Sequence, residues 1–139
     1  MSKHRADFAE LLKSHGYSLT KPRQLLFDML VGQEPMTMRE LAEKAAGNID
    51  RASVYRTVAI LEQIGAVHRI NIGWKYKIEL SDTFAEHHHH LTCLTCKRVI
   101  PINAHALESF IDNLAASHDF EPAEHQIEVQ GYCQNCREH

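Results

Sequence analysis

The sequence lacks the features that mark membrane-spanning and exported proteins. No apolar run approaches the roughly 20 residues that a membrane-spanning helix needs. Residues 1–12 carry charges where a signal peptide has its apolar core. The chain also lacks internal repeats, and its one low-complexity tract is a run of four consecutive histidines. These absences exclude a repeat or transmembrane architecture, and we expect a cytoplasmic protein.

Cysteine is scarce, and the four cysteines come in two pairs, Cys93-Leu-Thr-Cys96 and Cys133-Gln-Asn-Cys136. In the reducing cytoplasm, closely paired cysteines are more often metal ligands than disulfides. Two residues between cysteines let both thiolates reach one ion, and two such pairs complete a closed tetrahedral site. Structural zinc, which is redox-inert and accepts four sulfur ligands, fits best, with a redox dithiol or an iron–sulfur cluster as the alternatives.

Charge is divided unevenly along the chain. Up to Leu80 there are 12 lysines and arginines against 9 acidic residues, a balance of +3, and from Ser81 onward there are 3 against 9, a balance of −6. Eight of the 11 histidines also lie in the second part. A basic first part and an acidic, histidine-rich second part predict that one binds a polyanion and the other binds cations. A chance difference in surface charge is the alternative.

The first part is expected to contain four short helices followed by a two-stranded hairpin. Capping residues and terminal glycines delimit the helices, and alternating apolar residues mark the strands. This order is typical of a winged helix-turn-helix, whose recognition helix enters the DNA major groove, or of a small helical domain with a hairpin. The expected helices are 5–15, one capped by Thr20 that runs until Gly32, 38–46 capped by Thr37, and 51–64 capped by Asp50. The expected strands are 66–72 and 75–80.

The helix expected at 51–64 has one face suited to close contact with another surface. Helical spacing turns Val54, Val58 and Leu61 inward. Small alanines then alternate with polar side chains on the opposite face, at Ala52, Arg56, Ala59 and Gln63.

The second part predicts a compact α/β unit after a polar hinge at 81–86. Strands are expected at 87–94, 98–102 and 127–129. A helix is expected at 104–118, and its apolar residues Leu107, Phe110, Ile111 and Leu114 are predicted to be buried. The predicted organisation is therefore α+β, with an N-terminal winged helix at 1–80, the hinge, and a C-terminal α/β domain at 87–139.

The four histidines precede the first cysteine pair directly. Side chains alternate along a strand, so His87 and His89 are expected on one face and His88 and His90 on the other. One tract can then supply two separate metal sites, whereas purposeless exposed imidazoles or a tag remnant are the alternatives. The remaining ligands must come from other acidic or histidine residues, and the candidates are Glu79, His105, Glu108, Asp112, His118 and His125. For Glu108, the alternative is a solvated charge on the surface of a helix.

Four stretches together resemble one known family. They lie in order at the family's spacing, so the match extends over nearly the whole chain: Gly16-Tyr-Ser-Leu-Thr20-Lys-Pro-Arg23, Ala52-Ser-Val-Tyr55-Arg56, His87-His-His-His-Leu-Thr-Cys93-Leu-Thr-Cys96 and Gly131-Tyr-Cys133-Gln-Asn-Cys136. The sequence is thereby similar to the ferric uptake regulator family. The resemblance implies a homodimeric, metal-responsive repressor of double-stranded operator DNA, with a C-terminal dimerisation domain and metal sites at the hinge.

The resemblance also assigns roles to particular residues. It implies that Ser53, Tyr55 and Arg56 bind operator DNA, with Arg23 supporting the DNA-binding unit. It further implies two metal sites besides the cysteine site: a regulatory site of Glu79, His88 and His90, and a second site of His87, His89, Glu108 and His125. This division agrees with the alternation expected along the histidine strand.

Three positions depart from the family's pattern. Pro35 stands where the family usually has a histidine ligand of the sensing site. His89 stands where iron-type members often have aspartate, which makes that site softer and favours zinc. Ser18 stands where some members have a lysine that reaches into the minor groove. The regulatory metal is therefore left open among Fe²⁺, Zn²⁺ and Mn²⁺.

The function predicted from the sequence is a metal-dependent repressor of iron or zinc homeostasis genes. Two alternatives come from other classes: a zinc-binding storage protein or chaperone, and a metalloenzyme. The sequence contains no HExxH motif, and no general base is fixed next to the histidine tract, so we do not expect an enzyme.

Overall fold

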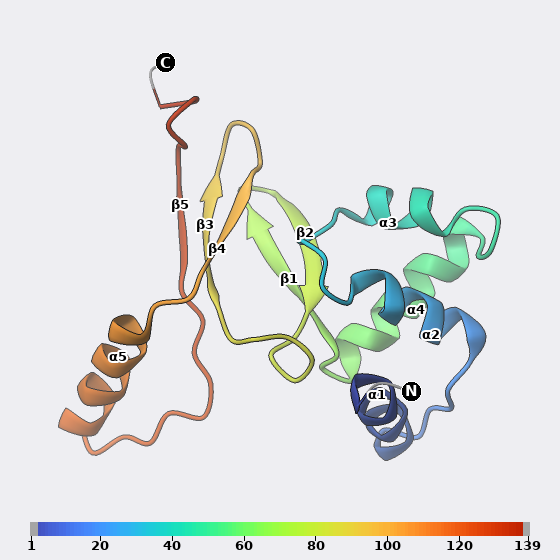
Figure 1. The fold of residues 1–139 in the computed structure, drawn as a ribbon, viewed down its shortest axis with the longest axis horizontal. Coiled ribbons are helices and arrows are strands. Elements are labelled where there is room, and N and C mark those ends of the chain that lie inside the picture. Colours follow the sequence, from blue (N-terminus) through green and yellow to red (C-terminus); the bar gives the residue numbers. More distant parts are fainter. Residues whose placement is uncertain (1–2, 138–139) are drawn as a thin grey trace. The chain divides into compact units, whose positions relative to one another are not determined.

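The computed structural model describes residues 3–137 and divides into two compact units, residues 1–86 and 87–139 (Figure 1). Residues 1–2 of the predicted domain 1–80 and residues 138–139 of the predicted domain 87–139 lie outside the described residues. Among the helices of the described part, none is long and apolar enough to cross a membrane. The chain mixes helices and sheets, as predicted.

The first unit contains the four predicted helices and the hairpin, each within two residues of the predicted ends. They are α1 (Lys3–Ser14), α2 (Lys21–Leu30), α3 (Met38–Ala45), α4 (Arg51–Gln63), β1 (Val67–Ile72) and β2 (Lys75–Leu80). The predicted caps are present, because Thr20, Thr37 and Asp50 each accept a hydrogen bond from the amide three residues later. Such side chains satisfy amides that have no partner within the helix.

The core of the first unit joins its helices to the hairpin. Phe8 of α1 stacks on Phe27 of α2, with ring centroids 4.3 Å apart. Phe84 packs edge-on against Phe27 at 4.9 Å and is itself buried. Phe84 belongs to the segment predicted as a hinge, 81–86, so an aromatic contact fixes part of that segment in the first core.

The second unit is a three-stranded sheet with one helix. Its elements are β3 (His89–Cys93), β4 (Val99–Ile102), α5 (His105–Ser117) and β5 (Glu128–Gly131). The strand order is β4-β3-β5, with β3 antiparallel to β4 and parallel to β5. Because β3 is central, His90 pairs with both neighbouring strands, while His89 pairs with β4 and Cys93 with β5.

One prediction for the second unit is wrong for the described chain: α5 contains no buried residue. Phe110 is 64% exposed and Leu114 53% exposed. In Figure 1, α5 stands beyond the ends of the strands instead of lying across a face of the sheet. The helical period correctly identified one apolar face, but the described part of this unit covers it only partly, because Leu107 and Ile111 are half-buried and Phe110 and Leu114 are exposed.

Candidate metal centres and DNA-binding helix

The four cysteines meet at one point of the second unit. Their sulfur atoms all lie within 4.8 Å of one another. The Sγ atoms of Cys96 and Cys133 are 3.8 Å apart, and zinc–sulfur bonds of about 2.3 Å in a tetrahedron place sulfurs about 3.8 Å apart. The cluster therefore has the dimensions of a closed four-thiolate zinc site.

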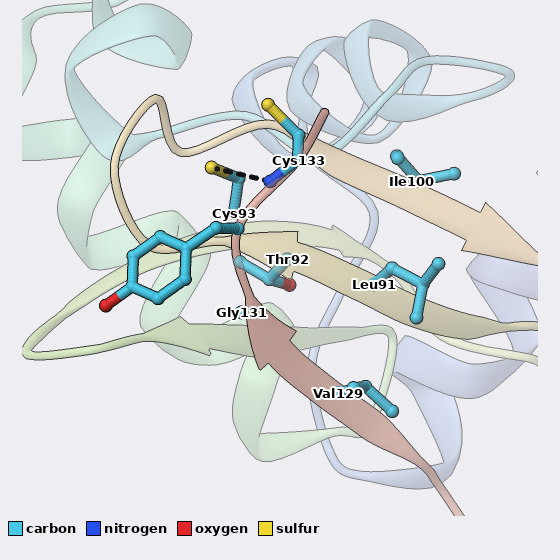
Figure 2. A pocket seen from close by; sticks show the side chains of 8 residues that line it. Leu91, Thr92, Cys93, Ile100, Val129, Gly131 and Cys133 are labelled. Atoms are coloured by element: carbon cyan, nitrogen blue, oxygen red, sulfur yellow. Dashed lines mark hydrogen bonds between the residues drawn. The ribbon is translucent and has the colours of Figure 1, made fainter. Parts of the chain in front are cut away.

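The backbone explains why the two cysteine pairs meet. Cys93 ends β3, and a tight turn returns the chain to β4, with the Cys93 amide donating to the Arg98 carbonyl at 2.9 Å. The second pair follows β5, which lies beside β3, and the Leu94 amide donates to the Gly131 carbonyl at 2.8 Å. Figure 2 shows one cysteine of each pair, Cys93 and Cys133, with the Cys133 amide donating to Cys93 Sγ.

The pKa values of two cysteines in this cluster are shifted in opposite directions. The backbone amides of Cys133 and Cys96 lower the pKa of Cys93 to about 6 by stabilising its thiolate. Hydrogen bonding to the Cys133 side chain, then burial, raise the pKa of Cys136 to about 12. Four thiols this close cannot all ionise without a cation, so a divalent metal that binds them must release protons.

A second cluster joins the histidine tract to α5 and the loop before β5. The ligand atoms of His87, His89, Glu108 and His125 all lie within 4.8 Å of one another. Glu108 contacts Nε2 of His89 and of His125, each at 2.5 Å. Glu108 is thus surrounded by imidazoles rather than being a solvated helix charge.

Electrostatics within this second cluster favour an ionised Glu108. Desolvation by itself raises the pKa of this carboxyl, but hydrogen bonds from His89 and His125 outweigh it, and the net pKa is lowered. The Ile127 amide donates to Nδ1 of His89 at 3.0 Å. That bond places the His89 proton on Nε2, so a cation that binds Nε2 must displace it.

The three residues assigned to the regulatory site lie in different units. Glu79 is in β2 of the first unit, 6% exposed, and its Oε1 lies 2.9 Å from Nε2 of His68. His88 and His90 are in the second unit, and their ring centroids are 4.7 Å apart. The His87 and His89 centroids are also 4.7 Å apart, so the predicted alternation of the tract is confirmed. The regulatory role of these residues stays a prediction.

Sequence reasoning missed His68, although a signal for it was available. A two-residue connection at Gly73-Trp74 sets the hairpin register, which pairs Ile72 with Lys75 and, further along, His68 with Glu79. Counting residue pairs back from this turn places His68 opposite Glu79, using the sequence alone. Of the other candidate ligands, His105, Asp112 and His118 join none of the clusters found among the described residues.

Helix α4 presents the face expected of a recognition helix. Val54, Val58 and Leu61 are buried, as predicted. Tyr55 is 42% exposed, and Arg56 is exposed as well. Both side chains are therefore accessible from solvent. Helices α2 and α3 pack against α4.

Local contacts organise the polar start of this helix. Asp50 accepts from the hydroxyl of Ser53 at 2.6 Å, and Arg56 donates to the same hydroxyl at 2.9 Å. Hydrogen bonds from the Ser53 side chain, then its amide, lower the pKa of Asp50. Ser53 therefore links the cap to the arginine assigned to DNA binding.

Arg23 has a different environment from Arg56. Its Nη1 donates to the Ser18 carbonyl at 2.6 Å, and its guanidinium lies 5.3 Å from the centroid of the Tyr17 ring. These contacts hold the connection between α1 and α2, in keeping with a supporting role rather than a direct base contact.

Known proteins share both the sequence pattern and the fold. The sequence matches the ferric uptake regulator family over residues 14–130. A ferric uptake regulation protein of Yersinia pestis is 32% identical over 142 residues, covering 95% of this chain and 93% of the relative. Its counterpart from Escherichia coli strain K12 is 33% identical over 137 residues, covering 91% and 90%. The crystal structure of the Vibrio cholerae ferric uptake regulator superposes with a TM-score of 0.72 at 27% identity, covering 89% of this chain and 98% of that chain.

These matches identify the class of the protein as metal-responsive transcription regulators, and the capped helix and the clusters of metal-ligating side chains agree with that class. The chain belongs to the ferric uptake regulator family. Members of this family are dimeric DNA-binding regulators and not enzymes. Membership therefore decides against the metalloenzyme alternative.

Proposed function

We propose that this protein is a cytoplasmic, metal-dependent repressor that binds operator DNA as a homodimer and controls genes of iron or zinc homeostasis. One observation carries the proposal. Its second unit gathers metal-ligating side chains into two separate clusters, while its first unit exposes Tyr55 and Arg56 on a capped helix. A storage protein would need the clusters but not that helix face.

Zinc at the four cysteines is proposed to be structural. The site is closed by protein ligands, so it has no open position for a substrate or a signal. It would fasten the tail that follows β5 to the turn that follows β3, and so hold the histidine strand in register. The 3.8 Å separation of the Cys96 and Cys133 sulfurs supports this fit.

Regulation is proposed to depend on a cation bound by Glu79, His88 and His90. Because Glu79 belongs to the first unit and the two histidines to the second, an ion shared by all three would favour one arrangement of the units. The ion can bias that equilibrium only by binding one arrangement better. Nitrogen and carboxylate ligands suit Fe²⁺, Zn²⁺ and Mn²⁺. His87, His89, Glu108 and His125 are proposed as a further metal site.

DNA contact is proposed to rest on α4. Tyr55 can pack against a thymine methyl, Arg56 can bind guanine or phosphate, and Ser53 can donate to a phosphate. Arg23 would support this surface through the connection between α1 and α2. The exposed apolar face of α5 supports a homodimer contact, because large exposed apolar side chains commonly mark an interface.

The test is metal-resolved DNA binding. Protein with zinc only at the cysteines is mixed with a random double-stranded DNA library, with and without Fe²⁺, Zn²⁺ or Mn²⁺. Bound sequences are selected, and the affinity for the selected site is then measured. We expect at least one of these metals to raise affinity by about tenfold or more, equivalent to about 1.4 kcal/mol.

Two variants and one control sharpen this test. Arg56→Ala should weaken DNA binding with or without the regulatory metal, and Glu79→Ala should remove only the metal response. Lys13→Ala removes an exposed cation at the end of α1 and should change neither. If none of the three metals changes the affinity of the wild-type protein, metal-dependent repression is wrong and a constitutive DNA-binding protein remains.

A further inference from the structure

The carboxylate of Glu79 has a neighbour that its proposed metal role does not include. His68 lies directly opposite Glu79 in the β1–β2 register. Its Nε2 is 2.9 Å from Glu79 Oε1, a good hydrogen-bond distance. An ionised carboxylate only accepts hydrogen bonds, so the proton of this bond is on the imidazole.

Glu79 is a buried carboxylate, so a hydrogen-bond partner such as His68 stabilises it. It lies between Ile78 and Leu80, and all three residues are buried. A buried carboxylate is costly unless it is hydrogen-bonded or binds a cation. The His68 side chain is 27% exposed, so the pair is only partly shielded from water.

On the other side of β2, the described backbone partner is the segment of Pro35 and Met36, which carries no imidazole. Met36 pairs with Ile78 there, through backbone hydrogen bonds of 2.9 and 2.7 Å. The preceding residue is Pro35, whose side chain has no ligand atom. Within the hairpin, an imidazole reaches Glu79 from β1 instead.

We propose that His68 is a positioning residue for the regulatory metal. Its Nε2–H donates to Glu79 Oε1 and holds the carboxylate in one rotamer in which it can bind the cation. The inference rests on the proposed function, because it requires that Glu79 binds that cation. His68 itself acts through Glu79 and does not touch the metal.

The expected effect follows from how such partners act at metal sites. Hydrogen bonds to a ligating carboxylate restrict its orientation, and their loss typically lowers metal affinity by about 10- to 100-fold. His68→Ala should therefore weaken the regulatory site by about that factor. His68→Gln should retain more of the affinity, because its amide can also donate to Oε1.

The experiment is a chelator competition with Mn²⁺ on the full-length protein whose cysteines hold zinc. The regulatory class of sites is identified as the class that Glu79→Ala removes. We expect His68→Ala to weaken this class alone and His68→Gln to restore part of it. His15→Ala is the matched control, since His15 lies in the same unit with its Nδ1 3.0 Å from the Leu11 carbonyl oxygen, away from any proposed ligand.

Two further measurements separate positioning from other roles. The double variant His68→Ala, Glu79→Ala should bind Mn²⁺ no more weakly than Glu79→Ala, because the two residues act as one unit. X-ray absorption at the manganese edge should give the same number of imidazole ligands in wild type and His68→Gln. Melting curves of each variant report whether the first unit is still folded.

Each failure has a distinct meaning. If Glu79→Ala leaves every Mn²⁺ class unchanged, the proposed regulatory site is wrong, and this inference is overturned with it. If Glu79→Ala removes a class whose affinity His68→Ala does not change, only the positioning role is overturned. A loss of one imidazole in His68→Gln would also overturn it, because His68 would then be a ligand itself.

Discussion

The two units of this chain are stabilised by different kinds of interaction. In the first unit, every helix contributes buried apolar side chains to one core. In the second, α5 buries none, and the buried positions of β3 include His89, His90 and Cys93. We therefore expect the first unit to be stable through hydrophobic packing alone, and the second to depend on metal-ligating side chains and a partner surface.

Removing the structural zinc should have the largest effect and should fall on one unit. We expect Cys96→Ser, or chelation of the zinc, to unfold the second unit and abolish the dimer. Structural zinc supplies about 10–16 kcal/mol in small zinc-dependent domains at neutral pH. Circular dichroism, NMR spectra and sedimentation would measure the loss, and first-unit signals should persist. An intact dimer that responds to metal in the Cys96→Ser variant would contradict this dependence.

A cavity in the core of the first unit should destabilise that unit and leave the second unit intact. Leu61→Ala removes a fully buried side chain from α4 and should destabilise the first unit by about 2–5 kcal/mol. DNA binding should fall, while the zinc content and the dimer remain. Thermal melts with zinc analysis would check this. A simultaneous loss of zinc would show that the two units do not fold separately.

A substitution on the exposed apolar face of α5 tests whether the second unit depends on a partner surface. Phe110→Asp should weaken the dimer by about tenfold or more, or about 1.4 kcal/mol. It should leave zinc binding intact, because Phe110 is exposed within its own chain. Sedimentation equilibrium measures the change. Leu19→Asp, which alters an exposed residue of the first unit, is the control, and an equal effect there would refute the assignment of α5 to the interface.

The smallest effect is expected at the cap of α4. Asp50→Ala should modestly lower the melting temperature of the first unit at pH 7, and Asp50→Asn should largely preserve it, since asparagine also caps helices. The hydrogen bonds from Ser53 lower the Asp50 pKa in the folded state. The cap's contribution is thus present above the unfolded pKa of about 4 and is lost as pH falls through the lower folded pKa. Melting curves against pH should show the wild-type advantage over Asp50→Ala shrinking below about pH 4; an advantage unchanged at low pH would exclude a charged cap.

Much of the fold was predictable because local signals coincide with the elements. Thr20, Thr37 and Asp50 cap the helices that they were expected to cap, since capping involves only the next turn of chain. The paired cysteines and the alternation of the histidines were likewise readable from spacing of a few residues. The exposure of Phe110 and Leu114 was not predictable, because a helical period identifies an apolar face without identifying what covers it.

By itself, the sequence determined the order of the elements, the pairing of the cysteines and the two faces of the histidine tract. These follow from backbone periodicity and short-range hydrogen bonding, which act within a few residues. The family resemblance already grouped Glu108 with three histidines, and the structure brings the four side chains together. Only the tertiary structure decided that Phe84 packs in the first core and that His68 reaches Glu79. Such contacts join residues far apart along the chain, so they depend on how strands and helices pack and not on local spacing.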